Sequence, residues 1–247
     1  MSNIASNASQ YVEQMAALES DRRTRAAFQT LAVSLAPPRG HIFDFGSGPG
    51  IDALFFAQRG FKIAAYEIDP SMCAYFAGHC KDFIATGQIS LDCRDYATFL
   101  SDTPLVARSS ADLIVSNFAP LSLVSNLREL FHKFHALTNK TGRVLASVLN
   151  PYFIGDMRFP WWWRRIARLR RIGHYVLPSP GGPLTRRRFA LIAAECQPHF
   201  ELVRVFPGTP AGGQAVPEGF DPAHLNAANW LQIARNRFTF LLLQKTG

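Results

Sequence analysis

The residues of this chain best suited to bind a ligand are two carboxylates and the glycine-rich turn between them. Asp44 lies two residues before the segment from Gly46 to Gly50, which reads GSGPG, and Glu67 lies 23 positions after Asp44. Glycines let the backbone turn sharply and approach a ligand closely. An acid at the end of the next strand can accept hydrogen bonds from both hydroxyls of a ribose. The pattern predicts a nucleoside-binding site.

The predicted nucleoside carries a positive charge rather than a pyrophosphate. The dinucleotide fingerprint G-x-G-x-x-G requires a third glycine at the position of Ile51. A carboxylate as close to the turn as Asp44 also repels phosphate, whereas it attracts an ammonium group directly or through water.

Strands and helices alternate around this site. Apolar runs predict strands near residues 41–45, 61–67, 89–93, 112–117 and 143–149, with helices near 50–59, 70–84 and 125–138. Two helices are expected within residues 8–36, and after residue 184 a helix near 185–196, a strand at 200–206, a Gly/Pro-rich loop and a strand at 237–244. The alternation predicts an α/β fold with a doubly wound parallel sheet, whose ligands bind at the carboxyl ends of the strands.

The segment from Asp44 to Gly50 is similar to the first motif of class I S-adenosylmethionine-dependent methyltransferases. The resemblance continues at Glu67, at residues 93–96 (CRDY) and at residues 111–118 (ADLIVSNF), and covers residues 40 to 150. It implies a Rossmann-like seven-stranded sheet in the order 3-2-1-4-5-7-6, with the last strand antiparallel, helices on both faces and an insertion after strand 5. It also implies S-adenosyl-L-methionine as cofactor and S-adenosyl-L-homocysteine as product.

The end of the fourth strand bears on the class of acceptor. Residues 116–118 (SNF) resemble bacterial small-molecule methyltransferases, including relatives in quinone biosynthesis, although residues 119–121 (APL) depart from them. The Asn-Pro-Pro-aromatic motif of enzymes that methylate adenine N6 or glutamine amides is not found there. The resemblance therefore implies methyl transfer to an O, N or C atom of a small molecule in secondary or quinone-like metabolism.

The expected cofactor-binding residues follow the ends of the first four strands. Asp95 is expected to accept a hydrogen bond from the adenine amino group, with Asp92 as the alternative if the third strand ends earlier. Asn117 and Phe118 are expected beside the methionine portion. The full set is Asp44, Gly46, Ser47, Gly48, Glu67, Ile68, Met72, Asp95, Tyr96, Asn117 and Phe118.

Length and composition predict one domain of 247 residues with enough apolar residues, 48%, to form a full core. Its expected parts are N-terminal helices at 1–38, a cofactor-binding core at 39–150, a substrate-cap insertion at 151–183, and a C-terminal helix and strands at 184–247. Residues 1–25 contain no continuous apolar run, and no run reaches the roughly 18 residues of a membrane span. A cytoplasmic location is expected.

No metal site is predicted. Cys73, Cys80, Cys93 and Cys196 lack C-x-x-C spacing, so neither zinc nor a redox pair is indicated, and four reduced thiols are expected. His132 and His135 have helical spacing, but no carboxylate or cysteine partner accompanies them in the sequence.

The positive charge of the chain is concentrated in one segment. Residues 156–188 contain nine arginines and one acidic residue, a net charge of +8 that equals that of the whole chain. As a helix, residues 159–171 place Arg164, Arg168 and Arg171 on one face and Trp162, Ile166 and Leu169 on another.

Three functions compete for this segment: a lid over the active site, a surface for an anionic membrane, and a nucleic-acid contact. A structural or oligomeric face is a further alternative. The lid is favoured because the segment follows the fifth strand, where the family often builds its substrate cap. The expected substrate-binding residues are Tyr152, Trp162, Arg164, Arg165 and Arg168. The arginines at 186–188 oppose the dipole of the helix expected there, which suggests a partner anion.

The mechanism requires a general base only if the acceptor must lose a proton. The candidates on the insertion are His174, Tyr152 and Asp156, none of which belongs to a spacing signature.

The expected partner is a small-molecule acceptor, which the arginines would suit if it is acidic, with no obligate nucleic acid. The alternative functions are an RNA methyltransferase that uses the arginines and a non-catalytic binding protein with the cofactor fold. The sequence does not determine the oligomeric state.

Overall fold

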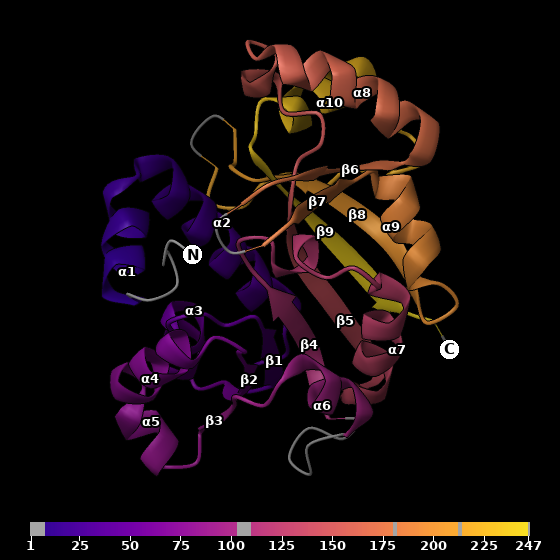
Figure 1. Cartoon of the computed structure of the whole chain (residues 1–247). Helices are drawn as coiled ribbons and strands as arrows, with labels where there is room; N and C mark the ends of the chain where they lie inside the picture. Colours follow the sequence, from indigo (N-terminus) through magenta and orange to yellow (C-terminus); the bar gives the residue numbers. More distant parts are fainter. Residues whose placement is uncertain (1–7, 103–109, 180–181, 212–213, 247) are drawn as a thin grey trace.

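A seven-stranded sheet forms the centre of the protein (Figure 1). The computed structural model describes residues 8–102, 110–179, 182–211 and 214–246, so parts of the expected N-terminal segment and insertion lie outside the described residues. The strand order is β3-β2-β1-β4-β5-β9-β8. The strands are β1 (His41–Phe45), β2 (Lys62–Tyr66), β3 (Ile89–Asp92), β4 (Ala111–Ser116), β5 (Thr138–Leu149), β8 (Phe200–Pro207) and β9 (Phe238–Lys245).

The observed order confirms the expected sheet, because β8 and β9 are its sixth and seventh strands. β1 to β5 pair in parallel, and β9 is antiparallel to both β5 and β8. The carboxyl ends of the first four strands therefore meet at one edge, next to the point where the strand order reverses between β1 and β4. Ligands bind at such points in open α/β sheets.

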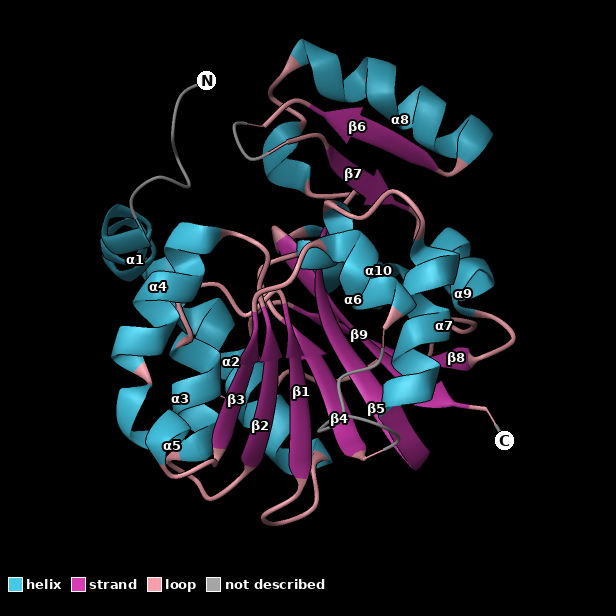
Figure 2. Ribbon diagram, turned by 60° about the horizontal axis from the view of Figure 1, so that its bottom comes forward, coloured by secondary structure: helices cyan, strands magenta, loops and turns pink. Residues whose placement is uncertain are grey.

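Helices cover both faces of the sheet (Figure 2). Apolar side chains of α2 (Glu19–Leu35), α3 (Ile51–Ala57) and α4 (Pro70–His79) form one core with the sheet, and those of α7 (Leu127–Leu137) and α9 (Phe189–Cys196) form the other. Ile42 of β1 belongs to the first core and Phe43 to the second. Because both faces are buried, the strands are almost continuously apolar. The remaining core helices are α1 (Ala8–Ala17), α5 (Lys81–Ala85) and α6 (Tyr96–Ser101).

The insertion after β5 builds a small layer of its own. A short η2 turn (Ile154–Asp156) leads into α8 (Pro160–Ile172), which packs against a hairpin of β6 (His174–Leu177) and β7 (Leu184–Arg187). In Figures 1 and 2 the hairpin lies between α8 and the carboxyl ends of the central strands. The expected helix is confirmed, with Trp162 and Leu169 buried and Arg164, Arg168 and Arg171 exposed on the other side.

Two expectations for the C-terminal part are wrong. The helix expected near 185–196 begins only at Phe189, because residues 184–187 pair with β6 as a strand. The Gly/Pro-rich loop expected before β9 contains the helix α10 (Ala227–Ala234). A reciprocal capping box of Asn226 and Asn229 starts this helix.

The expectation of four reduced cysteines is also wrong, since a disulfide joins Cys73 to Cys93. Cys73 lies in the first half of α4, after β2, and Cys93 directly follows β3. β2 and β3 are neighbouring parallel strands, so residues just beyond their carboxyl ends come together, and the two Cα atoms are 6.4 Å apart. The sequence separation of 20 residues hid this proximity.

No described helix is long and apolar enough to cross a bilayer.

Arg186 fixes the insertion to the end of β5. Its guanidinium donates to the Asp156 carboxylate at 2.5 Å, to the Asn150 carbonyl at 3.1 Å and to the Tyr175 hydroxyl at 3.3 Å. Arg186 and Asp156 are both largely shielded from water. The anion partner expected for the arginines at 186–188 is thus, for Arg186, a carboxylate of this chain.

We expect Asp156→Ala to lower the free energy of unfolding by about 3–5 kcal/mol, because it leaves a buried guanidinium without its counter-charge. Urea denaturation followed by circular dichroism measures this change. Glu19→Ala is the matched control, since its pair with Arg23 is exposed and contributes less than about 1 kcal/mol. Equal effects of the two variants would contradict the proposed role of the buried pair.

Candidate functional site

A cavity of about 560 Å³ opens at the carboxyl ends of β1, β2 and β4. Its walls come from α1, the glycine turn, the start of α4, the start of α6 and the loop after β4. The lining residues are Tyr11, Phe45, Gly46, Gly48, Tyr66, Glu67, Ile68, Asp69, Met72, Tyr96, Asn117, Phe118, Pro120, Leu123, Val124 and Ser125. Of the cofactor-binding residues expected from the sequence, eight line this cavity.

The glycine turn brings backbone rather than side chains to the cavity. Gly46 has φ 69°, and a Cβ there would lie 2.6 Å from the side chain of Pro120. Gly48 has φ 54°, and no protein atom lies within 4 Å of the place where its Cβ would be. Both backbone conformations disfavour any residue with a side chain. The space beside Gly48 remains open to a ligand.

Glu67 holds the turn against the end of β2. Its carboxylate accepts hydrogen bonds from the amides of Gly48 at 2.7 Å, Ile68 at 2.8 Å and Asp69 at 2.9 Å. Burial raises the pKa of the Glu67 carboxyl, while the three amide donors act in the opposite direction. The side chain therefore lies where the sequence pattern requires a ribose-binding acid, already fixed by the backbone.

One oxygen of the buried Asp44 carboxylate lacks a hydrogen-bond donor. The residue is 2% exposed, and its Oδ2 atom accepts no hydrogen bond in the described structure. Burial raises the pKa of Asp44 well above its ordinary value, the nearby Asp52 charge adds to this effect, and Arg25 opposes it. A buried anionic oxygen without a partner is costly. The site thus fits a ligand that brings a positive group, as S-adenosylmethionine does.

Asp52 links three elements beside the turn. Its carboxylate accepts from Arg25 at 2.5 Å and Gln29 at 2.7 Å, both on α2, and from Asn117 at 3.1 Å at the end of β4. The Arg25 guanidinium also lies 4.5 Å from the centre of the Phe118 ring. Sequence reasoning missed Arg25 and Asp52, because nothing in the spacing of the chain relates α2 to the glycine turn.

The loop after β4 is held in an unusual backbone conformation. Phe118 has φ 59° and Ala119 has φ 66°, which few residues other than glycine adopt. The Asn117 side-chain oxygen accepts from the Phe118 amide at 2.9 Å, and the Phe118 ring packs edge-on against Phe238. These contacts turn the chain sharply into the η1 turn (Pro120–Ser122), which borders the cavity.

Tyr11 was also missed. The periodicity of α1 assigns it only to an apolar helix face, but the structure places it in the cavity wall. Burial raises the pKa of its hydroxyl, which is close enough to Arg25, Asp52 and Glu67 for their charges to act on it. The N-terminal helix therefore belongs to the site.

The structure does not bring Asp95 to the cavity. Its two carboxylate oxygens accept from the Thr98 amide at 3.0 Å and the Thr98 hydroxyl at 2.6 Å, so the side chain caps α6. The alternative acid, Asp92, is bound to Arg94. Tyr96 does line the cavity, and burial raises its pKa to about 12.

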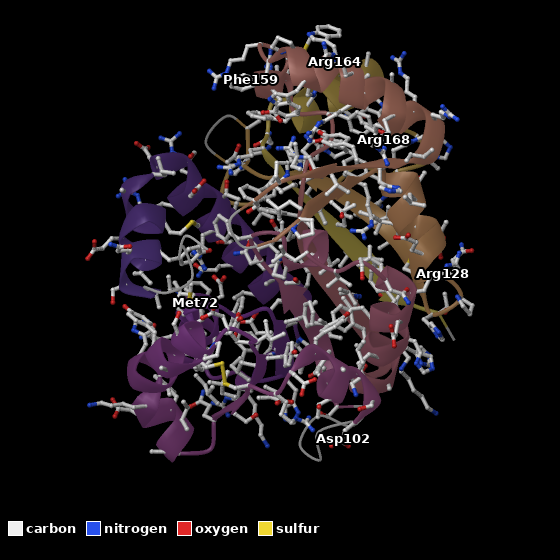
Figure 3. All side chains as sticks on the ribbon, in the orientation of Figure 1. Met72, Asp102, Arg128, Phe159, Arg164 and Arg168 are labelled. Atoms are coloured by element: carbon white, nitrogen blue, oxygen red, sulfur yellow. A yellow bond between two sulfur atoms is a disulfide. The ribbon has the colours of Figure 1, made fainter. Side chains whose placement is uncertain are left out.

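The residues expected to bind substrate from the insertion lie elsewhere. Trp162 is buried beneath α8, Arg164 and Arg168 are exposed on its outer side, and Arg165 donates to the Val176 carbonyl at 2.7 Å. Figure 3 shows Arg164 and Arg168 well away from the cavity residue Met72. Tyr152 packs edge-on against Trp230. None of these residues lines the cavity.

The candidate bases of the insertion also lie outside the cavity lining. The Asp156 carboxylate accepts a hydrogen bond from Arg186. The Tyr152 ring packs edge-on against Phe189 and Trp230. His174 begins β6 in the hairpin.

The hairpin nevertheless supports the cavity wall through Arg187. This buried side chain donates to the carbonyls of Leu121 at 3.2 Å, Val124 at 2.6 Å and Ser125 at 3.2 Å. Burial lowers the pKa of Arg187, while Glu195 at 3.5 Å opposes this effect. Because Val124 and Ser125 line the cavity, β7 positions part of its wall without touching the ligand space itself.

Within the described ranges, no group of three or more histidine, cysteine or acidic side chains is arranged to hold a metal ion.

Three solved methyltransferases have a similar fold. An S-adenosylmethionine-dependent methyltransferase from Mesorhizobium loti has a TM-score of 0.59 at 15% identity, covering 90% of this chain and 99% of the other. The 1,6-didemethyltoxoflavin-N1-methyltransferase of Burkholderia thailandensis has a TM-score of 0.58 at 15% identity, covering 91% and 79%. Geranyl diphosphate C-methyltransferase from Streptomyces coelicolor A3(2) has a TM-score of 0.55 at 14% identity, covering 96% and 85%. At these identities the likeness is one of fold.

Comparison with curated proteins gives no match. The model of a family described as a methyltransferase domain matches residues 11–179, from the cavity residue Tyr11 through the core to the hairpin. This match covers more than half of the chain and includes the glycine turn, Asp44 and Glu67. The chain therefore belongs to this methyltransferase-domain family and is an S-adenosylmethionine-dependent methyltransferase.

Proposed function

We propose that the enzyme methylates an O, N or C atom of a small, largely apolar molecule of the quinone-like or secondary-metabolite kind. The observation that carries this proposal is the composition of the cavity wall apart from its carboxylates, Glu67 and Asp69. Tyr11, Phe118, Leu123 and Val124 form apolar surface there, and the cavity size is in the range typical of small-molecule sites.

The cavity argues against the alternative of an RNA substrate bound through arginines. Its described lining contains no lysine or arginine, although binding to nucleic acid depends largely on cationic contacts to phosphate. The absence of a basic lining also gives no support to an acidic acceptor. The family match and the presence of Asp44, the glycine turn and Glu67 support a catalytic protein over the non-catalytic alternative.

Each part of the proposed cofactor site has a physical role. Asp44 provides negative charge for the ammonium group, and Glu67 accepts from the ribose hydroxyls. In this proposal Asn117 would contact the methionine portion, and Ile68, Met72 and Tyr96, which line the cavity, would form the walls for the adenine. When bound, S-adenosylmethionine supplies an electrophilic methyl group on a positively charged sulfur.

The protein contributes alignment and exclusion of water rather than a dedicated base. The described cavity lining contains no histidine, and burial raises the pKa of Tyr11 and Tyr96, so these phenols stay protonated near neutral pH. Apolar walls that exclude water and hold two reactants in line account for a large part of the rate in such a displacement. We therefore propose an acceptor that reacts as a neutral nucleophile or loses its proton to solvent.

The proposed function is tested by following a labelled methyl group. Incubation of the purified enzyme with methyl-labelled donor and a cell extract should place label in the low-mass organic fraction. Ribonuclease treatment of the extract should leave this signal unchanged. Label that appears mainly in the RNA fraction and vanishes after ribonuclease would establish the alternative substrate class.

We expect Glu67→Gln to weaken cofactor binding by about 1–3 kcal/mol, because a neutral amide replaces a charged acceptor of hydrogen bonds. Calorimetric titration with S-adenosylmethionine measures the change. Glu201→Gln, an exposed position on β8, is the matched control and should leave affinity unaltered. Equal affinities of wild type and Glu67→Gln, with equal unfolding midpoints, would remove Glu67 from the binding site.

Cofactor affinity should also fall as the pH is lowered. Burial raises the pKa of both Asp44 and Glu67, so these carboxyls take up protons at a higher pH than exposed acids do, and protonation removes the charge that attracts the cationic ligand. Calorimetry at several pH values should show tighter binding towards neutral pH. Asp44→Asn should bind more weakly and with a shallower pH dependence. A variant with the slope of the wild type would show that Asp44 is not the titrating group.

A further inference from the structure

The outer side of α8 is an unneutralised cationic surface. Arg164, Arg168, Arg170 and Arg171 are exposed on α8, and Arg158 is exposed just before it; no carboxylate within the described ranges forms an ion pair with any of them. These arginines do not contribute to the packing of α8, because Trp162 and Leu169 on the opposite side are its buried residues. Like charges crowded on one helix face repel one another, and an anionic partner would relieve that repulsion.

Apolar side chains are exposed next to these arginines. Trp163 is 57% exposed on α8, and Ile154, Met157 and Phe159 are exposed just before the helix. The Trp163 indole donates its only polar hydrogen to the Met157 carbonyl at 3.0 Å, so its exposed ring has no remaining donor for water. Figure 3 shows Phe159, Arg164 and Arg168 along the same outer end of the molecule.

We propose that this face of α8, formed by Arg164, Arg168, Arg171 and Trp163, docks the enzyme on an anionic membrane surface. The inference goes beyond the methyl transfer itself, because none of these residues lines the cavity. Arginines beside anionic headgroups and a tryptophan at the level of the interface are the two contributions that hold a protein at a bilayer surface.

The apolar residues favour a lipid surface over nucleic acid. Besides the rings of Phe159 and Trp163, the surface exposes the aliphatic side chains of Ile154 and Met157, which suit the boundary of the acyl chains and contribute nothing to base stacking. The arginines from Arg164 to Arg171 also span only about 10 Å along the helix axis. They can therefore contact few consecutive phosphates of a nucleic-acid backbone.

The proposal is tested on the full-length enzyme by co-sedimentation with vesicles. Vesicles of phosphatidylglycerol and phosphatidylcholine are compared with vesicles of phosphatidylcholine alone. The triple variant Arg164→Ala, Arg168→Ala, Arg171→Ala should reduce partitioning into the anionic vesicles about 100-fold, the effect expected for three arginines near a charged surface. The matched control is Arg128→Ala, Arg204→Ala, Arg235→Ala, which removes three exposed arginines outside this face and should change partitioning by less than about threefold.

Trp163 gives an independent measurement of the same contact. Trp163→Ala should reduce partitioning about tenfold, the scale for burying part of a large aromatic side chain. The wild-type fluorescence should shift to the blue on vesicles, and the variant should lose that shift, because Trp163 is more exposed than Trp161, Trp162 and Trp230.

Several outcomes would overturn the proposal. They are equal binding of wild type to neutral and anionic vesicles, equal effects of the two triple variants, or no effect of Trp163→Ala on vesicle binding. Loss of binding to a single-stranded RNA in the arginine variant, with vesicle binding retained, would identify a nucleic-acid surface instead. Cofactor affinity by calorimetry should be the same in all variants, so failure of this proposal leaves the methyltransferase site unaffected.

Discussion

The buried carboxylate of Asp52 is the interaction on which the candidate site depends. It receives hydrogen bonds from Arg25 and Gln29 on α2 and from Asn117 at the end of β4, while its own backbone belongs to the helix that follows the glycine turn. One side chain thereby fixes the N-terminal helices, the first motif and the fourth strand relative to one another. Its charge also helps to raise the pKa of Asp44. The network thus adds to the cost of a negative charge on Asp44, and a cationic ligand beside this residue would lower that cost.

Much of the fold could be predicted from the sequence because its signals are local. Each central strand is a short apolar run bounded by turn residues, and Gly46, Gly48 and Glu67 lie at fixed offsets from the first of them. The sheet order followed from the family resemblance. The cap of α6 shows where local signals become ambiguous, since an aspartate after a strand either faces the ligand or caps the next helix. In this structure Asp95 caps the helix.

What the sequence did not reveal depends on contacts between distant segments. Tyr11 and Arg25 reach the site from helices whose patterns mark them only as an ordinary amphipathic pair. The disulfide of Cys73 and Cys93 depends on strand adjacency rather than on cysteine spacing. Arginines of similar appearance in the sequence have opposite environments, because Arg186 and Arg187 are buried in β7 while Arg164 and Arg168 face water. Burial of a charge is decided by its partners, which no single segment contains.

The two hydrogen-bonded arginines of β7 make the insertion and the cavity wall parts of one mechanical unit. Arg187 donates hydrogen bonds to the carbonyls of Leu121, Val124 and Ser125, and α8 packs on the other side of the same hairpin. A displacement of α8 would therefore be transmitted to the cavity wall at Val124 and Ser125. Free energies of binding at two coupled places are reciprocal. If a partner shifts α8 and with it this wall, it changes the affinity for a ligand bound against the wall, and that ligand changes the affinity for the partner by the same factor.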